Sequence, residues 1–334
     1  MRKEATIKDI AFELGKSPST VSRALQNHPR ISKKTRDLVH QKALELKYVP
    51  NPAAKLLRAN KTQTIGLLLP WLKEEFFSLL LTAIEDVVSS QGYHIIVCQS
   101  RDNLEREKKL TQSLLSHRID GLIAAVSAET NHYGHFKQLE EHGIPTIFLD
   151  RTPRNYACNK VVNNSTSGAT EAIRFLVARG VRNIGMINAP GNLQVAEERL
   201  NGYLEAILEL GLQTRPQYIK STNLTMEETE KCMAELASLP NPPQGILAFN
   251  DYVAMQAMNA CRNLGIIPNK DILFVSFGNL PITAFMENPP LASVEQFAYE
   301  MGEKAARLLL KNIGDQKIGE PYDEVVINTE LIVH

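Results

Sequence analysis

Residues 6–25 read TIKDIAFELGKSPSTVSRAL and carry the start and stop signals of two short helices. Thr6 is a suitable N-cap for a first helix over 7–14, where apolar residues recur at helical spacing. Gly15 follows the last turn, where a glycine commonly ends a helix. Ser17 and Pro18 then begin a second helix, because serine caps it and proline at its first position loses no hydrogen bond. The stretch predicts two helices joined by a tight turn.

The second predicted helix runs from Pro18 to about Leu25 and has two different faces. Its apolar residues point inward, and its polar face carries Ser19, Thr20, Ser22 and Arg23. A third helix, capped by Ser32 and running to about Lys47, would support the pair. Such a helix-turn-helix unit places its second helix in the major groove of DNA. Hydroxyl side chains there can donate to phosphates, and an arginine can read a guanine. A generic three-helix bundle is the alternative that spacing alone leaves open.

Residues 48–58, YVPNPAAKLLR, predict a conditional helix. Asn51-Pro52 repeats the cap-plus-proline start, but the helix would be only about seven residues long. Isolated helices shorter than about 12 residues are marginal in water, so we expect this one to form only when it packs on a partner copy and DNA. A leucine on such a basic helix can wedge between base steps in the minor groove. An ordinary linker is the alternative.

These motifs together resemble the headpiece and hinge of the LacI/GalR family of bacterial transcription regulators. The similar segments are 6–11, 17–23, 31–36 and 48–57. The resemblance implies that Pro18, Ser19 and Arg23 read bases and that Leu57 is the minor-groove wedge. Lys16 departs from the family, which usually has an apolar residue in this turn. Ala54 and Lys55 would lie beside the wedge. Together, the helix pattern and the resemblance predict these DNA-binding residues: Thr6, Ser17, Pro18, Ser19, Thr20, Ser22, Arg23, Tyr48, Ala54, Lys55 and Leu57.

The charge of the chain is unevenly divided. The 334 residues hold 37 Lys and Arg against 37 Asp and Glu, so the total charge is zero and by itself argues against nucleic acid as a partner. Residues 1–61 alone hold 14 basic and 5 acidic residues, a net charge of +9, and the rest of the chain balances it with −9. This asymmetry indicates a basic module on an acidic body. A solvated basic surface is the alternative that charge alone leaves open.

Residues 62–334 alternate β-rich apolar runs with amphipathic segments. Repeated units of this kind predict parallel sheets covered by helices, and about 270 residues are too many for one compact sheet, so we expect two lobes. The predicted fold class is an all-α headpiece plus a two-lobed α/β core with parallel sheets, similar to periplasmic binding proteins. The predicted strands are 64–69, 94–98, 121–125, 146–149, 183–187, 245–249 and 272–277, and the predicted helices include 76–90, 165–178, 196–210 and 252–264.

The predicted domains follow from these patterns and from the resemblance. We expect a DNA-binding domain over 1–49, a hinge over 50–61 and an effector-binding core over 62–334. Within the core, we expect one lobe over about 62–162 plus 295–324 and the other over 163–292 plus 325–334. The chain would then cross between the lobes near Asn163, near Ser293–Glu295 and near Val325.

Ligands of parallel sheets bind beyond the carboxyl ends of the strands, so the residues that follow each run are candidate site residues. Aromatic, Asp, Arg and Asn side chains there suit a small polyhydroxylated or planar polar ligand. Alternatives are that Phe76 and Phe77 belong to the core, that Asp150 is an N-cap and that Arg199 is solvated. The resemblance extends over the core and implies effector-binding roles for Trp71, Phe76, Phe77, Asp150, Val195, Arg199, Leu224 and Asn250.

One segment of the core departs from the family. Where the family often has Gly-Phe-Asp, this chain has Ser276-Phe277-Gly278, so the resemblance implies that an acidic ligand anchor is missing. This departure prevents the transfer of any familiar sugar specificity. The effector implied is a small molecule such as a sugar, a sugar phosphate or a nucleobase-like compound.

Other function classes lack support in the sequence. No apolar run is long enough to span a membrane, no signal peptide follows Met1, and the four cysteines are widely spaced, so we expect a cytoplasmic protein. Nucleophile-elbow, phosphate-loop and dinucleotide-binding motifs are missing, so we expect no enzyme and no cofactor. His132 and His135 have no Cys or acid at ligand spacing, so we expect no metal site. The sequence predicts an effector-responsive regulator, acting as a homodimer on double-stranded operator DNA, that represses carbohydrate or related small-molecule metabolism.

Overall fold

The computed structural model describes residues 5–48, 61–191 and 193–334. The chain divides into two compact units, Met1–Asn60 and Lys61–His334, and each is described by itself. All four cysteines are free thiols. Among the described residues, no helix is both long and apolar enough to cross a membrane.

The described residues of the first unit, 5–48, form three helices: α1 (Ile7–Glu13), α2 (Pro18–Leu25) and α3 (Lys33–Glu45). The predicted caps are present, because Thr6, Ser17 and Ser32 each accept a hydrogen bond from the backbone N–H three residues later. Gly15 has a φ of +59°, a left-handed conformation that glycine adopts without strain. Two helices end slightly earlier than predicted, since Leu14 and Leu46 are C-caps. The helices enclose a small core of Ile10, Ala11, Val21, Ala24, Val39 and Ala43.

The second unit contains two six-stranded sheets, one in each lobe. The first has the strand order β11-β5-β4-β3-β1-β2 and the second has the order β12-β10-β9-β8-β6-β7. All neighbouring strands are parallel except β12, which runs antiparallel to β10. The strands of the first sheet are β1 (Thr64–Leu69), β2 (His94–Gln99), β3 (Gly121–Ala124), β4 (Thr146–Leu149), β5 (Asn159–Asn163) and β11 (Glu324–Ile327). Those of the second are β6 (Ile184–Asn188), β7 (Ile219–Ser221), β8 (Gly245–Ala248), β9 (Leu273–Gly278), β10 (Ala292–Glu295) and β12 (Glu330–Val333).

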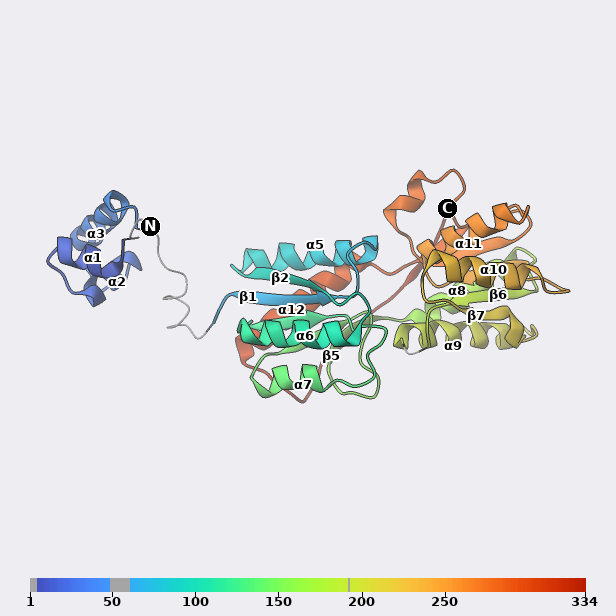
Figure 1. Cartoon of the computed structure of the whole chain (residues 1–334), viewed down its shortest axis with the longest axis horizontal. Helices are drawn as coiled ribbons and strands as arrows, with labels where there is room; N and C mark the ends of the chain where they lie inside the picture. Colours follow the sequence, from blue (N-terminus) through green and yellow to red (C-terminus); the bar gives the residue numbers. More distant parts are fainter. Residues whose placement is uncertain (1–4, 49–60, 192) are drawn as a thin grey trace. The chain divides into compact units, whose positions relative to one another are not determined.

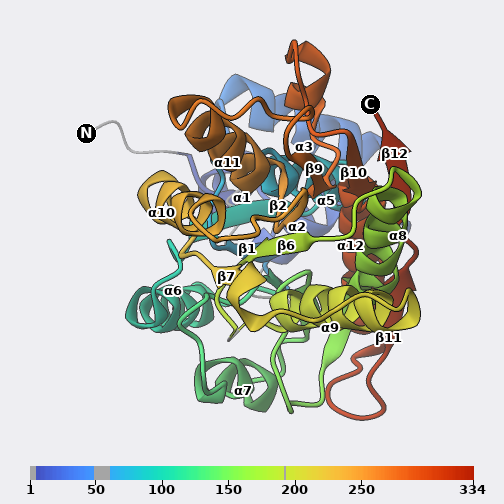
Figure 2. The same ribbon diagram turned by 90° about the vertical axis from the view of Figure 1, so that its right-hand side faces the viewer.

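Helices cover both faces of each sheet (Figures 1 and 2). In the first lobe α5 (Glu75–Ser90) and α12 (Ala298–Asp315) pack on one face, and α6 (Leu104–Ser116) and α7 (Gly134–Glu141) pack on the other. In the second lobe α8 (Ser165–Ala178) and α9 (Gln194–Glu209) form one layer, and α10 (Met226–Ala237) and α11 (Asp251–Asn263) form the opposite one. Each strand is therefore buried on both sides, which explains the nearly continuous apolar runs in the sequence.

Gly202 brings α8 and α9 close together. A Cβ atom at this position would lie 2.1 Å from the backbone oxygen of Thr166 and 2.9 Å from the Cβ of Ala169. Only glycine fits such a backbone approach. The close packing of these two helices therefore depends on the missing side chain.

The chain crosses between the lobes three times: after β5, after β10 and after β11. The third crossing corrects the predicted boundary near Val325, because Glu324–Ile327 pairs with β5 in the first sheet and the chain crosses only after Ile327. The strand lies at the edge of its sheet, and Val326 is exposed there. Hydrogen bonds join the crossings: Asn163 Nδ2 donates to Gln296 O (2.8 Å), and Asn164 Oδ1 accepts from Thr329 N (3.0 Å).

Candidate functional site: a DNA-reading helix and an interlobe cleft

The amino-terminal end of α2 presents a cluster of hydroxyl groups. Ser17 Oγ lies 2.9 Å from Ser19 Oγ and 2.8 Å from Thr20 Oγ1, and it accepts a hydrogen bond from Thr20 N (3.1 Å). Pro18, Ser19 and Arg23 are exposed. This end of the helix offers hydroxyl donors beside a positive side chain, which are the groups that contact phosphates and guanine edges in DNA.

Ser22 corrects the predicted outward face of α2. Its side chain is buried, with only 6% of its surface exposed. A helix turns by about 100° per residue, which places Ser22 about 60° from Leu25 and on the edge of the buried arc. The outward face is therefore narrower than predicted and consists of Ser19, Thr20 and Arg23.

The remaining predicted DNA-binding residues have structural partners or lie outside the described residues. Thr6 is exposed and forms the capping box of α1: its hydroxyl oxygen accepts from Asp9 N (3.3 Å), and its backbone N donates to Asp9 Oδ2 (2.7 Å). Tyr48 is half-buried and packs on the core of the helical unit. The predicted hinge helix, with Ala54, Lys55 and Leu57, lies outside the described residues.

The second candidate site is the cleft between the two lobes of the core, where two neighbouring cavities share a wall. The first has a volume of about 30 Å³ and the second about 300 Å³. Glu74, Asn250 and Tyr252 line both cavities. The first cavity also contains the predicted site residues Phe76, Phe77, Asp150 and Arg199, and the second contains Trp71 and Leu224.

Arg199 is a deeply buried charged group in the wall of the cleft, with 2% of its surface exposed. Its guanidinium lies 4.3 Å from the ring centroid of Phe249 and 4.0 Å from that of Phe277. It also donates to the backbone oxygen of Phe249, whereas its Nε has no hydrogen-bond partner among the described residues. The rings hold the charge in place through cation–π contacts, and the guanidinium retains hydrogen-bonding capacity for a ligand.

Asp102 connects the loops that follow four strands of the first sheet. It accepts hydrogen bonds from Trp71 Nε1 (3.0 Å), Ala128 N (2.9 Å) and Arg151 NH1 (2.7 Å). Trp71 follows β1, Asp102 follows β2, Ala128 follows β3 and Arg151 follows β4. One carboxylate therefore positions groups from the walls of both cavities.

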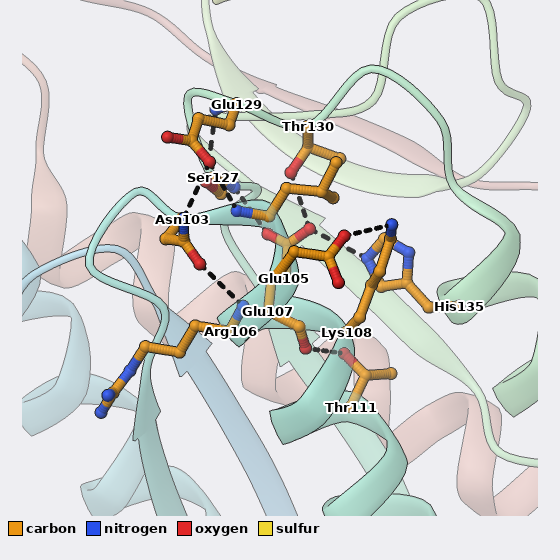
Figure 3. A network of polar contacts seen from close by, with 11 residues as sticks. Asn103, Glu105, Arg106, Glu107, Lys108, Thr111, Ser127, Glu129, Thr130 and His135 are labelled. Carbon is orange, nitrogen blue, oxygen red and sulfur yellow. Dashed lines mark hydrogen bonds and ion pairs between the residues drawn. The ribbon is translucent and has the colours of Figure 1, made fainter.

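A buried polar network holds the loop that follows β3, residues 127–130 (Figure 3). Glu107 on α6 is fully buried and accepts hydrogen bonds from Ser127 N (2.6 Å), Thr130 Oγ1 (2.7 Å) and His135 Nε2 (2.9 Å). Glu129 Oε2 accepts from the N-cap side chain of α6 at Asn103 (3.0 Å). Residues 127–130 are thus fixed to the start of α6, which also fixes Ala128 beside the cleft.

Two family models match nearly the whole chain. Residues 6–51 match the family described as "Bacterial regulatory proteins, lacI family", and residues 62–334 match "Periplasmic binding proteins and sugar binding domain of LacI family". The chain belongs to the LacI family. This LacI-family protein is a sequence-specific, effector-responsive DNA-binding transcription regulator.

Individual relatives cover nearly the full length of this LacI-family regulator. It is 32% identical to the ribose operon repressor of Halalkalibacterium halodurans, over 98% of this chain and 96% of that protein. It is 28% identical to the transcriptional repressor CytR of Escherichia coli (strain K12), over 98% and 95% of the two chains. Its fold is similar to that of the lac repressor dimer bound to operator and the anti-inducer ONPF, with a TM-score of 0.85, 23% identity and coverage of 99% and 98%. The two named relatives are repressors, which are not enzymes.

The carboxyl groups in the cleft of this LacI-family regulator are electrostatically unusual. Burial raises the pKa of Asp150, and Arg151 and Arg199 partly offset that effect. Burial also raises the pKa of Glu74, again partly offset by Arg151. Burial lowers the pKa of Arg199 to about 10. Perturbed groups of this kind are typical of functional sites.

The structure explains why Gly278 occupies the position where the family often has an acid. Its φ is +130°, which L side chains rarely adopt, and a Cβ atom there would lie 2.9 Å from Asp251 Oδ2. Asp251 is fully buried and accepts hydrogen bonds from Ser293 Oγ (2.7 Å) and Leu280 N (2.8 Å). An acid at 278 would bring a second carboxylate against the first, which like-charge repulsion disfavours.

One predicted site residue lines neither cavity, and several residues that do line the cleft are not predicted from the sequence. Val195 is buried in the core of the second lobe and lines neither cavity, because the first turn of α9 packs this side chain inward. Neither cavity therefore supports the prediction that it contacts effector. Residues missed are Lys73, Glu74, Asp102, Arg151, Phe249, Tyr252, Phe277 and Gln296. The rule that ligands lie beyond strand ends could have found Asp102, which follows β2 by three residues.

Proposed function

We propose that this regulator acts as a homodimeric repressor of genes of carbohydrate or related small-molecule metabolism. The dimer binds a near-palindromic operator through the α2 helices. A small polar effector in the interlobe cleft, such as a sugar, a sugar phosphate or a nucleobase-like compound, sets its affinity for DNA. The observation that supports the DNA-reading role best is the exposure of Pro18, Ser19 and Arg23 at the amino-terminal end of α2.

The proposed mechanism is linkage between the effector and operator sites. Effector bound between the lobes changes their closure about the three crossings, where Asn163 and Asn164 hold the strands together. The change alters the pairing of the hinge segments 50–61 in the two subunits, so that the hinge helices form on DNA or separate. Such coupling is reciprocal and is typically worth about 1–3 kcal/mol.

Exposed apolar residues support the homodimer. Phe285 and Ile282 lie on the short helix η2 (Pro281–Phe285) and expose 88% and 40% of their surfaces. We expect Phe285→Ser to weaken dimerisation in sedimentation experiments. Leu208→Ser is the matched control, because Leu208 is similarly exposed (79%) but is the one exposed large apolar residue on α9, whereas Phe285 and Ile282 lie together on η2; it should leave the dimer unchanged. If both variants keep the dimer intact, η2 is not part of the interface.

Deleting residues 1–61 tests the proposal against a binding module in which the headpiece is incidental. The deletion should abolish DNA binding and leave ligand-induced stabilisation of the core intact, since the core is a compact unit. The affinity of the full chain for operator should fall steeply with salt, with a slope near −0.9 per phosphate contacted. A flat salt profile, or DNA binding that survives the deletion, would contradict the proposal.

A further inference from the structure

A loop of the first lobe bonds to the start of a helix in the second lobe. Thr152 Oγ1 donates a hydrogen bond to Gln194 Oε1 (2.9 Å). Arg154 Nη2 lies 2.7 Å from Glu197 Oε2 and 3.4 Å from the backbone oxygen of Leu193. Thr152 and Arg154 follow β4 of the first sheet, and the other three residues lie at the start of α9. These contacts therefore join the two lobes at a place apart from the three crossings.

Both segments are anchored in the interior of their own lobes. In the first lobe Thr152 is buried, and the backbone N–H of Arg154 donates to the hydroxyl of Tyr133 (2.9 Å), whose ring packs on the core. In the second lobe Leu193 is the N-cap residue of α9 and is buried in the core. Close-packed interiors deform little, so neither segment can follow the other without disturbing its own packing. The contacts can therefore resist separation of the lobes.

Arg154 is held in a position that its own surroundings only partly satisfy. Its side chain is 32% exposed, yet its Nε is buried and has no hydrogen-bond partner among the described residues. A buried donor without a partner costs free energy. The bonds of its guanidinium to Glu197 and to the backbone of Leu193 offset this cost. The position of Arg154 is thus explained by its contact with the second lobe.

We define the latch as the four side chains that meet between the lobes: Thr152, Arg154, Gln194 and Glu197. The latch borders the first cavity, although none of its four residues lines either cavity. In the first lobe the cavity residues Asp150 and Arg151 directly precede it, and in the second lobe the cavity residue Arg199 follows it by two positions. The latch therefore joins two walls of the cavity from outside.

We propose that the latch sets the fraction of molecules in which the two lobes are closed. It thereby sets the operator affinity in the absence of effector and the effector concentration needed for a response. The inference rests on the proposed function, in which lobe closure links the two sites. It assigns a regulatory role to four residues to which neither the sequence patterns nor the resemblance to the LacI family gives a function.

A weak contact is sufficient for this role. An ion pair that is partly exposed shifts an equilibrium only slightly, because water screens its charges. Lobes that open and close have two conformations of similar free energy, so even a small term changes their populations. The same factor applies to every effector, since the latch acts on the protein and not on the ligand. We expect loss of the ion pair between Arg154 and Glu197 to change the closed-to-open ratio by about two- to fivefold.

Exchange of the two charges tests the latch on the full chain. Arg154→Glu and Glu197→Arg each place like charges across the gap, whereas the double variant restores an opposite pair in reverse order. The readout is quenching of Trp71 fluorescence by acrylamide, a neutral quencher. Trp71 is the only tryptophan in the chain, and it shares the second cavity with Leu224 of the second lobe, so opening exposes it. We expect each single variant to raise the quenching constant and the double variant to bring it back toward that of the parent protein.

Two further variants guard against a trivial effect of the substitutions. Arg174→Glu is the matched control, because Arg174 pairs with Glu209 at 2.7 Å, and both residues lie in the second lobe, on α8 and α9. It should leave the quenching unchanged. Thr152→Val removes the hydroxyl that donates to Gln194 but keeps the buried shape of the side chain, and it should raise the quenching constant. Circular dichroism of each variant checks that it is folded.

Binding to a duplex selected from random DNA separates the inference from the proposed function. Without any added effector, each single charge variant should change the operator affinity by about two- to fivefold, and the double variant should restore it. If the quenching does not change in the single variants, or if the double variant is no closer to the parent than they are, the latch does not hold the lobes and the inference is overturned. If the quenching changes and is restored while the operator affinity stays constant, the proposed linkage between closure and DNA binding is wrong, and the regulatory role of the latch falls with it.

Discussion

Asp102→Asn should disturb the effector site by changing the hydrogen bonds that hold its wall in place. The aspartate accepts hydrogen bonds from Trp71 Nε1, Ala128 N and Arg151 NH1. An asparagine of the same shape can keep the two bonds on Oδ1, but its amide group then faces the indole N–H of Trp71, and two donors repel. The substitution should therefore release Trp71 from the cleft wall.

The magnitude follows from the kinds of bond that change. The bond from Arg151 falls from about 1.5–3 kcal/mol, the range for a charged partner, to about half of that, and the Trp71 bond of about 1 kcal/mol is lost. Because 23% of the side chain of Asp102 is exposed, water screens part of this loss. We expect a net destabilisation of about 2 kcal/mol and an effector affinity that is roughly tenfold weaker.

The single tryptophan makes the assay specific to this site. Emission from Trp71 should shift to longer wavelength as the ring becomes more solvated, and the effector titration should move to higher concentration. Asp86→Asn is the matched control, because Asp86 on α5 accepts a hydrogen bond from Tyr299 outside both cavities. Unchanged Trp71 emission together with unchanged effector affinity in Asp102→Asn would refute the positioning role of Asp102.

Three further predictions concern stability and DNA binding. Burial raises the pKa of Asp150 above its value in the unfolded chain, so the charged carboxylate destabilises the folded core at pH 7. Asp150→Asn should therefore raise the thermal unfolding midpoint at pH 7. The gain should vanish as the pH falls toward 3.8, because below that pH the carboxyl is protonated in both the folded and the unfolded state. Gly202→Ala should destabilise the core by about 1–3 kcal/mol in denaturant titrations, since the added methyl group collides with Thr166 O; a neutral result would mean that α8 and α9 can separate easily. Leu57→Ala should weaken specific DNA binding much more than non-specific binding and reduce the DNA bend, whereas an equal loss of both would remove Leu57 as the wedge.

The helical unit could be predicted well because its signals are local. The caps Thr6, Ser17 and Ser32 and the stop at Gly15 act within a few residues of the chain, and the structure contains each of them. The burial of Ser22 could not be predicted in the same way. It depends on how wide an arc of α2 the neighbouring helices cover, and that width is a tertiary property.

The buried strands were predictable for a different reason. Central strands of a covered parallel sheet are apolar on both faces, so β1, β4 and β8 are visible as apolar runs. β7 reads Ile-Lys-Ser and is short and partly polar, so its sequence resembles a loop. β11 reads Glu-Val-Val-Ile and is recognisable as a strand, but the sequence does not show which sheet it joins, so the boundary predicted near Val325 falls inside it.

The cleft was predicted in outline through the rule that ligands bind beyond strand ends. Asp150, Arg199 and Asn250 do meet at the first cavity. Glu74 was missed because an acid before a helix is typical of an exposed helix start, and only the packing of the second lobe against it makes it part of a cavity wall. The position of Glu74 in the cavity wall can therefore be recognised only from the structure of both lobes.

Selection of DNA by the full-length protein from a pool of random duplexes tests the central claim most directly. The account predicts that a near-palindromic sequence is enriched, that its affinity falls steeply with salt, and that a cleft ligand changes this affinity. Removing the side chain of Arg23 should relax the preference at one base position in each half-site. If no sequence is enriched over the starting pool, the protein does not read DNA and the account is wrong.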